Sequence, residues 1–247
     1  MPINKIVASF DEAVADMGDG ATIHVGGFGG PGGYPSYLIR AVARKGVTNL
    51  TIVANSPGSG REIRLKTATL LPPPDWFYEV SLLVEQRQVK RAIASFPVSA
   101  SPLVVTPFER QLRAGEVEIE MVPQGTLAER IRAARAGIPA FYTPTGPGTV
   151  VAEGKEIRYL NGKPCLLEHA LRADFALIRA LKADRYGNLV YRMTARSFNA
   201  TMAGAAEVTI AEVDEVVELG ELDPEAIVTP GIYVDRVVVR PKEGQGD

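Results

Sequence analysis

Short apolar runs rich in β-branched residues alternate with segments of helical periodicity along the first half of the chain. Such runs predict buried strands, and the segments between them predict helices with one apolar face. The expected strands are 22–25, 50–54, 92–96 and 116–121, and the expected helices are 11–17, 36–44, 80–89, 107–114 and 126–136. Because strand and helix alternate, the sequence predicts an α/β fold with a mostly parallel sheet.

Capping signals mark two of the predicted helix starts. Ser36 suits the N-cap of the helix over 36–44, because its side chain is able to accept a hydrogen bond from a free backbone N–H. Thr126 and Glu129 have the spacing of a capping box, which predicts that the next helix begins at Thr126.

The second half of the chain has a different pattern. Asn161-Gly162 separates two short β-type runs, 155–160 and 163–167, and predicts a hairpin. Further strands are expected at 174–182, 208–213 and 234–239, the last at a sheet edge, with a turn at 187–188 and a short helix at 201–206. Residues 58–75, with three consecutive prolines, are the least regular part. No repeat, linker or break is visible, so we expect one domain over residues 1–247.

Charge and composition narrow the class of protein. The 247 residues include 27 Lys and Arg against 29 Asp and Glu, a net charge of −2 that argues against a nucleic-acid partner. The single cysteine, Cys165, excludes a disulfide framework and a cysteine-based zinc site. No apolar run is long enough to span a membrane, and the first residues do not form a signal-peptide pattern, so we expect a cytoplasmic protein with no membrane partner.

A glycine-rich loop follows the first predicted strand. Residues 27–32 match the pattern G-x-G-x-x-G, which is typical of dinucleotide-binding turns. Pro31 has no N–H for a phosphate, however, and the strand over 50–54 ends in Asn55 where an acidic residue would hold a ribose. The alternatives are a loop whose N–H groups hold an anion or an oxyanion and a tight turn without a ligand. The number of glycines favours the functional loop.

Gln124 lies between a predicted strand and the following helix, at the edge where open α/β sheets bind ligands. Its amide could hold a substrate carboxylate, or it could be an ordinary surface residue, and spacing alone does not decide. His24 lies within a strand and is expected to be a hydrogen-bonded structural histidine. Cys165 and His169 lack further ligands for a metal, and the acidic stretch 207–225 is expected to be a solvated face. The residues thus offer binding loops and no obvious nucleophile.

Longer stretches resemble a known family. The chain is similar to the A (alpha) subunit of class I CoA-transferases of the 3-oxoacid type, and the likeness covers nearly the whole chain in order, in residues 19–28, 50–55, 123–132, 137–146, 151–156, 173–178, 187–192 and 229–234. The resemblance implies a three-layer α/β/α open sheet and a partner B subunit that carries the nucleophilic glutamate in a Ser-Glu-Asn-Gly motif. That motif does not occur in this chain.

The resemblance also implies the chemistry and the site. Coenzyme A is a substrate, no cofactor is bound permanently, and CoA passes through a glutamyl thioester on the B subunit between an acyl-CoA, such as succinyl-CoA, and a carboxylic acid. No catalytic residue and no metal ligand are expected on this chain. Gln124 would hold the substrate carboxylate, Asn55 would be a donor near the reacting carbonyl, and Gly27, Phe28 and Gly29 would line the site where the subunits meet.

Departures from the family pattern bear on the acid that is used. The loop after Phe28 is one residue longer than usual, Ser56 replaces a second Asn, and 58–75 is extended. Residues 95–99 are nearer to the 3-oxoadipate type than to the acetoacetate type. We therefore expect 3-oxoadipate or acetoacetate as acceptor, with a preference for a longer or dicarboxylic acid. The alternatives are an acyl-CoA hydrolase or lyase on the same subunit pair, an NAD(P)-binding protein and a noncatalytic, partner-stabilising subunit.

Overall fold

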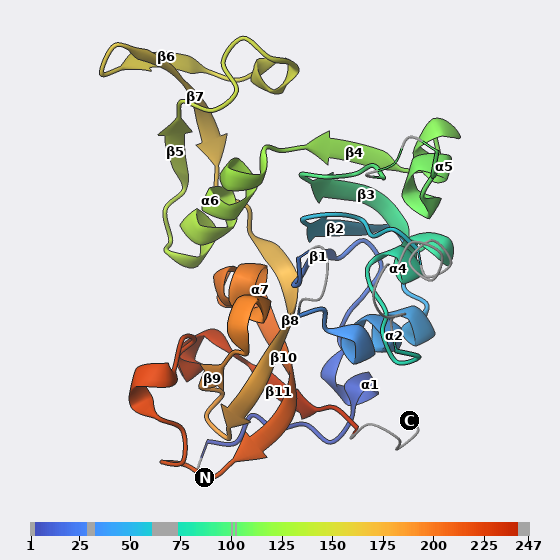
Figure 1. Ribbon diagram of the computed structural model, residues 1–247, viewed down its shortest axis with the longest axis vertical. Helices are drawn as coiled ribbons and strands as arrows, with labels where there is room; N and C mark the ends of the chain where they lie inside the picture. The colour runs from blue at the N-terminus through green and yellow to red at the C-terminus, as the bar shows by residue number, and fades with distance from the viewer. Residues whose placement is uncertain (1–2, 29–32, 61–73, 100, 102, 242–247) are drawn as a thin grey trace.

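A mostly parallel sheet forms the centre of the molecule (Figure 1). The computed structural model describes residues 3–28, 33–60, 74–99, 101 and 103–241. Along the strand order β11-β10-β8-β1-β2-β3-β4 every pairing is parallel, and β9 is antiparallel to β8. The strands are β1 (Thr22–Val25), β2 (Leu50–Ala54), β3 (Val89–Ala94), β4 (Glu118–Met121), β8 (Ala173–Asp184), β9 (Leu189–Val190), β10 (Ala206–Val217) and β11 (Arg236–Val239).

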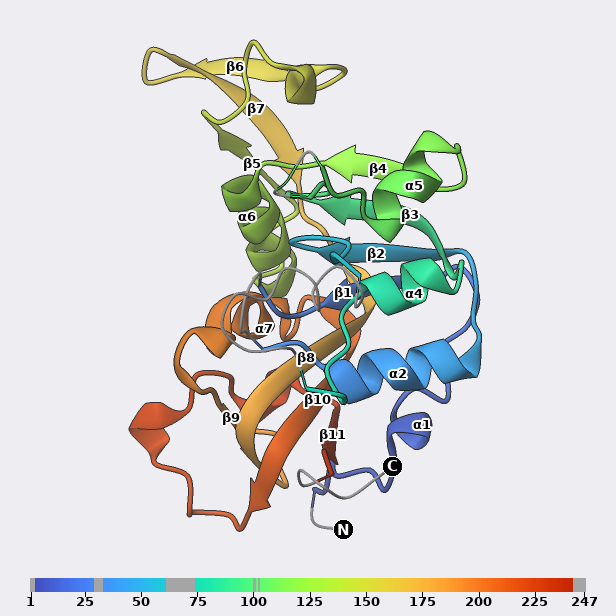
Figure 2. The same ribbon diagram turned by 45° about the vertical axis from the view of Figure 1, so that its right-hand side comes forward.

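Helices cover both faces of this sheet, which confirms the three-layer α/β/α arrangement (Figure 2). One apolar core joins the sheet to α1 (Phe10–Ala13), α2 (Ser36–Lys45), α4 (Ser81–Glu85) and α5 (Pro107–Arg113). A second core, on the opposite face, joins it to α6 (Gln124–Arg135) and α7 (Ser197–Met202). Strands buried on both faces explain why the sequence shows continuous apolar runs there.

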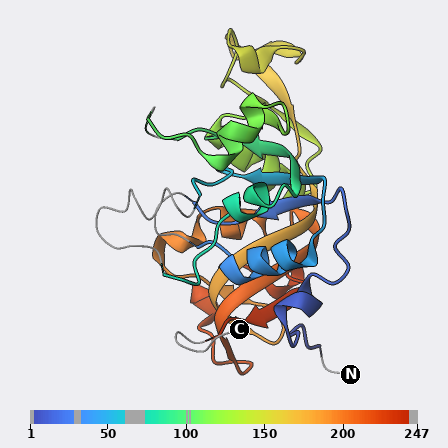
Figure 3. The ribbon, with the colours of Figure 1, turned by 90° about the vertical axis from the view of Figure 1, so that its right-hand side faces the viewer.

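A smaller antiparallel sheet projects from the body, as Figure 3 shows from the side. Its strands are β5 (Ala140–Thr143), β6 (Ile157–Leu160) and β7 (Lys163–His169), in the order β5-β7-β6. The hairpin predicted from Asn161-Gly162 is confirmed, and both residues have positive φ, as a tight turn of this kind requires. All four residues of β6 are exposed.

Several predicted boundaries are wrong. Ser36 is the first residue of α2, with Pro35 at the N-cap, and the Ser36 hydroxyl donates to the Tyr78 carbonyl. Likewise α6 begins two residues before Thr126, after Pro123, and the buried Thr126 hydroxyl has no hydrogen-bond partner among the described residues. In both helices a proline fixes the backbone before the first turn, so the chain enters the helix without a side-chain cap.

Other elements differ in length. The segment expected as one helix over 80–89 is the short α4 followed by the start of β3. β8 and β10 have 12 residues each and extend past the predicted ends, and α7 begins four residues before its predicted start. Of the irregular segment 58–75, residues 61–73 lie outside the described part of the chain. Within the described residues, no helix has the length and apolar character that crossing a membrane requires.

Candidate functional site

The carboxyl ends of β1 to β4 bring the predicted site segments to one edge of the sheet. Asn55 follows β2, and its carbonyl accepts hydrogen bonds from the N–H groups of Ser95 and Phe96, just after β3, at 3.2 and 2.9 Å. The Val122 N–H, just after β4, donates to Ala94 at the end of β3. Asn55 follows β2 and the segment that leads to Gln124 follows β4, with β3 between them, so both lie at the carboxyl edge of the sheet.

The side chains of Asn55 and Gln124 are available donors at this edge. Asn55 is half-buried and Gln124 is exposed, and neither amide has a hydrogen-bond partner among the described residues. Gln124 was expected in the loop before the helix, but it is the first residue of α6. It therefore lies beside the N–H groups of the first helical turn, which favour negative charge.

The glycine-rich loop has a structural reason for several of its glycines. A Cβ at Gly26 would overlap the Asn199 amide, and a Cβ at Gly27, where φ is 101°, would lie 2.6 Å from the Tyr34 ring. A Cβ at Gly33 would lie 2.6 Å from the Asn199 amide nitrogen. The number of glycines is thus partly explained by close packing, which weakens the sequence argument that it signals ligand binding.

Asn199 closes the base of this loop. Its side chain is fully buried, its oxygen accepts from the Arg179 N–H at 2.9 Å, and its amide donates to the carbonyls of Gly33 and Ala195, both at 2.8 Å. No local pattern marks Asn199, because it precedes the helix expected at 201–206 and two of its three partners, Gly33 and Arg179, come from distant segments. Asn199 fixes where the loop begins and ends.

Phe28 is the last described residue before the gap in the glycine-rich loop, and Gly29 lies outside the described residues. The Phe28 ring stacks on Phe198 of α7 at a centroid distance of 6.1 Å and remains 42% exposed. Two further apolar side chains at the carboxyl edge are also exposed, Phe96 by 48% and Met121 by 53%. The edge that carries Asn55 and Gln124 thus presents apolar surface to the surroundings.

The acidic stretch 207–225 is not uniformly solvated, which corrects the prediction. Glu212 in β10 is fully buried, and one of its carboxyl oxygens accepts from the N–H groups of Tyr37 and Leu38 at the start of α2, at 2.9 and 3.2 Å. Its other oxygen has no partner among the described residues. Burial raises the pKa of the Glu212 carboxyl to about 7, against the opposing effect of Arg179.

His24 is fully buried, and the hydrogen bond predicted for it is not found among the described residues. Neither ring nitrogen has a hydrogen-bond partner among the described residues. Burial lowers the pKa of His24 to about 3, against the opposing effect of the Leu171 backbone, so the ring is neutral at physiological pH. Within the described part of the chain, no cluster of three or more His, Cys, Asp or Glu residues is arranged to hold a metal ion.

Comparison with known proteins agrees with this architecture. The family model described as Coenzyme A transferase matches residues 7–240. The chain is 50% identical to the A subunit of 3-oxoadipate CoA-transferase from Pseudomonas putida over 96% of this chain and 94% of that protein. It is 44% identical to the A subunit of succinyl-CoA:3-ketoacid coenzyme A transferase from Helicobacter pylori, strain J99, over 95% and 92% of the two chains.

A solved structure shows the same fold. An acyl-CoA transferase from Escherichia coli O157:H7, described as a thioester complex with CoA, superposes with a TM-score of 0.78 at 25% identity. The superposition covers 98% of this chain and 48% of that one, so this chain spans about half the length of the solved transferase. On the family model and on these relatives together, the chain belongs to the coenzyme A transferase family, among its A subunits.

Proposed function

We propose that this chain is the A subunit of a cytoplasmic 3-oxoacid CoA-transferase, which works with a B subunit to move CoA from an acyl-CoA to a 3-oxoacid. The observation that carries the proposal is the pair of unpartnered amides, Asn55 and Gln124, at one sheet edge beside the start of α6 in the part of the chain that the structure describes. Neutral donors that are already in place stabilise an oxyanion or a carboxylate without introducing a competing charge.

The nucleophile of the reaction belongs to the B subunit in this proposal. Its glutamate carboxylate attacks the thioester carbonyl, and the C–S bond breaks to give an acyl anhydride and the CoA thiolate. The thiolate then attacks the glutamyl carbonyl, which forms the enzyme thioester and releases the first acid as its carboxylate. The acceptor carboxylate takes CoA by the reverse steps.

This chain supplies the surroundings of those steps. Gln124 holds the carboxylate of the acid, and Asn55 donates to the oxygen that becomes negative when the carbonyl is attacked. The exposed Phe28, Phe96 and Met121 are the surface on which the B subunit closes the site and excludes water. Gly27 and Phe28 then form the wall of the site on this side.

A dicarboxylic 3-oxoacid such as 3-oxoadipate is the proposed acceptor, with succinyl-CoA as donor. The support is the resemblance of residues 95–99 to the 3-oxoadipate type, together with the name of the Pseudomonas putida relative. A panel of acceptors tests this step. A higher kcat/KM for acetoacetate than for 3-oxoadipate would contradict it.

The test of the whole proposal compares this chain alone with its complex with the B subunit. We expect CoA transfer only from the complex, and trapping of the thioester with borohydride or hydroxylamine should modify a glutamate of the B chain. Transfer by this chain alone, or a modified glutamate within it, would overturn the proposal. Release of free CoA without an acceptor acid would identify a hydrolase instead.

A further inference from the structure

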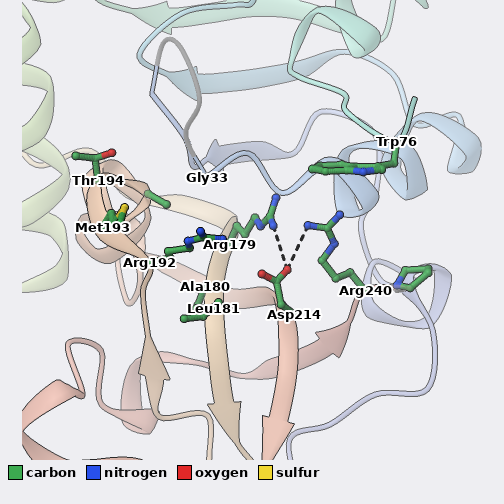
Figure 4. A pocket seen from close by; sticks show the side chains of 12 residues that line it. Gly33, Trp76, Arg179, Ala180, Leu181, Arg192, Met193, Thr194, Asp214 and Arg240 are labelled. Atoms are coloured by element: carbon green, nitrogen blue, oxygen red, sulfur yellow. Dashed lines mark hydrogen bonds and ion pairs between the residues drawn. The ribbon is translucent and has the colours of Figure 1, made fainter. Parts of the chain in front are cut away.

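A cavity of about 570 Å³ lies near the start of α2 (Figure 4), and neither Asn55 nor Gln124 is among the residues that line it. Its walls come from β8, from β10, from the residues after β11 and from the 3₁₀ helix Met193–Arg196, with Gly33 of the glycine-rich loop above them. This volume is in the range of sites that bind small molecules. Nothing in the proposed transfer reaction uses this cavity.

Two arginines on one side of the cavity are held in fixed positions. Arg179 and Arg240 both donate to the same oxygen of Asp214, at 3.0 and 3.2 Å, and Figure 4 shows their guanidinium groups side by side beneath Trp76. The Arg240 guanidinium lies 4.0 Å from the centre of a Trp76 ring, and that of Arg179 lies 5.5 Å away. Guanidinium groups held in this way lose little freedom when they bind a carboxylate.

A third arginine, Arg192, lies on the other side of the cavity with Met193 and Thr194 (Figure 4). Arg192 is exposed, and its guanidinium has no ion-pair partner in the part of the chain that the structure describes. Three arginines against Asp214 give the lining residues an excess of two positive charges. An excess of this size selects for an anion with two negative charges.

Glu212 interacts electrostatically with Arg179 and Arg240 but does not line the cavity and does not cancel this excess. Its carboxyl is fully buried and accepts from two N–H groups of α2, and burial raises its pKa to about 7, so it is only partly ionised at neutral pH. The remaining lining includes the apolar Ala180, Leu181 and Met193. A hydrated inorganic anion makes no use of such surface, whereas a short carbon chain does.

We propose that this cavity binds a small dicarboxylate of about four to six carbon atoms. One carboxylate lies on Arg179 and Arg240, the other on Arg192, and the carbon chain crosses the apolar floor between them. Paired charge-assisted hydrogen bonds to arginine give the ends their selectivity. The site is separate from the proposed transfer reaction and does not depend on it.

Trp76 provides the measurement, because it is the one tryptophan of the chain. Titrating the full chain with succinate, and separately with adipate, should give a saturable change in tryptophan fluorescence and the same Kd by calorimetry. Butyrate, which has one carboxylate, and inorganic phosphate should bind at least about tenfold more weakly. Calorimetry on the complex with the B subunit checks that the site remains open there.

Three variants test the part that Arg192 plays in this site. Arg192→Ala should weaken succinate binding by about ten- to a hundredfold, and Arg192→Lys by less. Arg196→Ala, at the end of the 3₁₀ helix that follows Arg192 and outside the cavity lining, should leave the affinity unchanged. The proposal is overturned by calorimetry that finds no succinate binding, by phosphate or butyrate binding as tightly as succinate, or by an unchanged affinity in Arg192→Ala.

Discussion

Gln124 is the residue on which the proposed substrate contact can be tested most cleanly. Its side chain is exposed at the first position of α6 and makes no hydrogen bond to the described residues, so Gln124→Ala should leave the fold intact. Loss of a donor to a carboxylate costs about 1.5–3 kcal/mol, which is about a 10- to 150-fold fall in kcat/KM for the acid. Steady-state assays of the assembled enzyme measure this fall.

The matched control for this prediction is Gln86→Ala. Gln86 is also exposed, but it lies at the end of α4, away from the carboxyl edge of β4. The enzyme with Gln86→Ala should have the same kcat/KM for the acid as the wild type. Equal values for all three proteins would show that Gln124 does not contact the acid.

His24 makes the fold sensitive to acid. Its pKa is about 3 in the folded chain and about 6.5 when exposed, so below pH 6.5 the unfolded chain binds a proton that the folded chain does not. The free energy of unfolding should therefore fall by about 2 kcal/mol between pH 7 and pH 5 on account of this residue. His24→Leu, which keeps an apolar group of similar size, should lack that part of the fall.

Denaturant unfolding at several pH values measures the difference between the two proteins. His169→Gln, which changes the other histidine at an exposed position, should follow the wild type. If His24→Leu also follows the wild type from pH 7 to pH 5, the buried imidazole does not control the acid response.

Glu212 connects strand β10 to the start of α2 through hydrogen bonds. Its contribution to stability changes with pH in the opposite direction to that of His24. The pKa of this carboxyl is about 7 when folded and about 4.5 when exposed, so the folded chain binds the proton more tightly. Stability is therefore lost as the pH rises from about 4.5 to about 7. Glu212→Gln keeps an oxygen that accepts from α2 and has no proton to lose. The unfolding free energy of Glu212→Gln minus that of the wild type should therefore rise by about 2–3 kcal/mol between pH 5 and pH 8.

Glu215→Gln is the control within the same strand. Glu215 is half-exposed and pairs with Lys182 at 2.8 Å, and exposed pairs of this kind contribute little to stability. Its pH dependence should match that of the wild type. A Glu212→Gln curve that runs parallel to both would mean that Glu212 has an ordinary pKa in the folded chain.

At the level of elements, the hydrophobic pattern predicted nearly all the strands, because a strand buried on both faces is a continuous apolar run. The pattern could not identify Glu212 as buried or Arg179 as mostly buried, since charged residues are usually exposed. Helix starts were less predictable. Ser36 and Thr126 have the right residue types for caps, yet the preceding prolines set the entry into each helix.

The candidate site was predictable where it follows strand ends and unpredictable where it depends on tertiary contacts. Asn55 and Gln124 follow predicted strands, so their common edge could be inferred. Asn199 and Trp76 contact residues far from them in the sequence, and no local pattern carries that information. The resemblance to the family, and not spacing, supplied the expected roles of the site residues.

For the molecule as a whole, the proposed contact with the B subunit predicts the effect of a surface change. Phe96 is 48% exposed at the carboxyl edge, so Phe96→Ser should hardly change the stability of this chain. Truncating an aromatic residue within an interface costs about 1–2 kcal/mol, so the affinity for the B subunit should fall about 5- to 30-fold. Surface plasmon resonance with the immobilised B subunit gives both rate constants.

Ile232→Ser is the control for the association experiment. Ile232 is 84% exposed in the 3₁₀ helix Gly231–Tyr233, which does not belong to the carboxyl edge of β1 to β4. It should bind the B subunit like the wild type. Equal weakening by both variants would place the contact elsewhere or show that the loss is nonspecific.

The central position of β1 decides what a growing chain exposes on the ribosome. β1 to β4 are able to pair once the first half has been translated, but the other edge of β1 lacks a partner until β8 follows, and Thr22 and its partner Asp174 are 152 residues apart. During that interval the nascent chain presents to its neighbours an open strand edge and the apolar surface that α7 covers in the folded chain. Chains whose translation stops before β8 are therefore the aggregating species, and chaperone binding to ribosome-bound chains should be concentrated in that window.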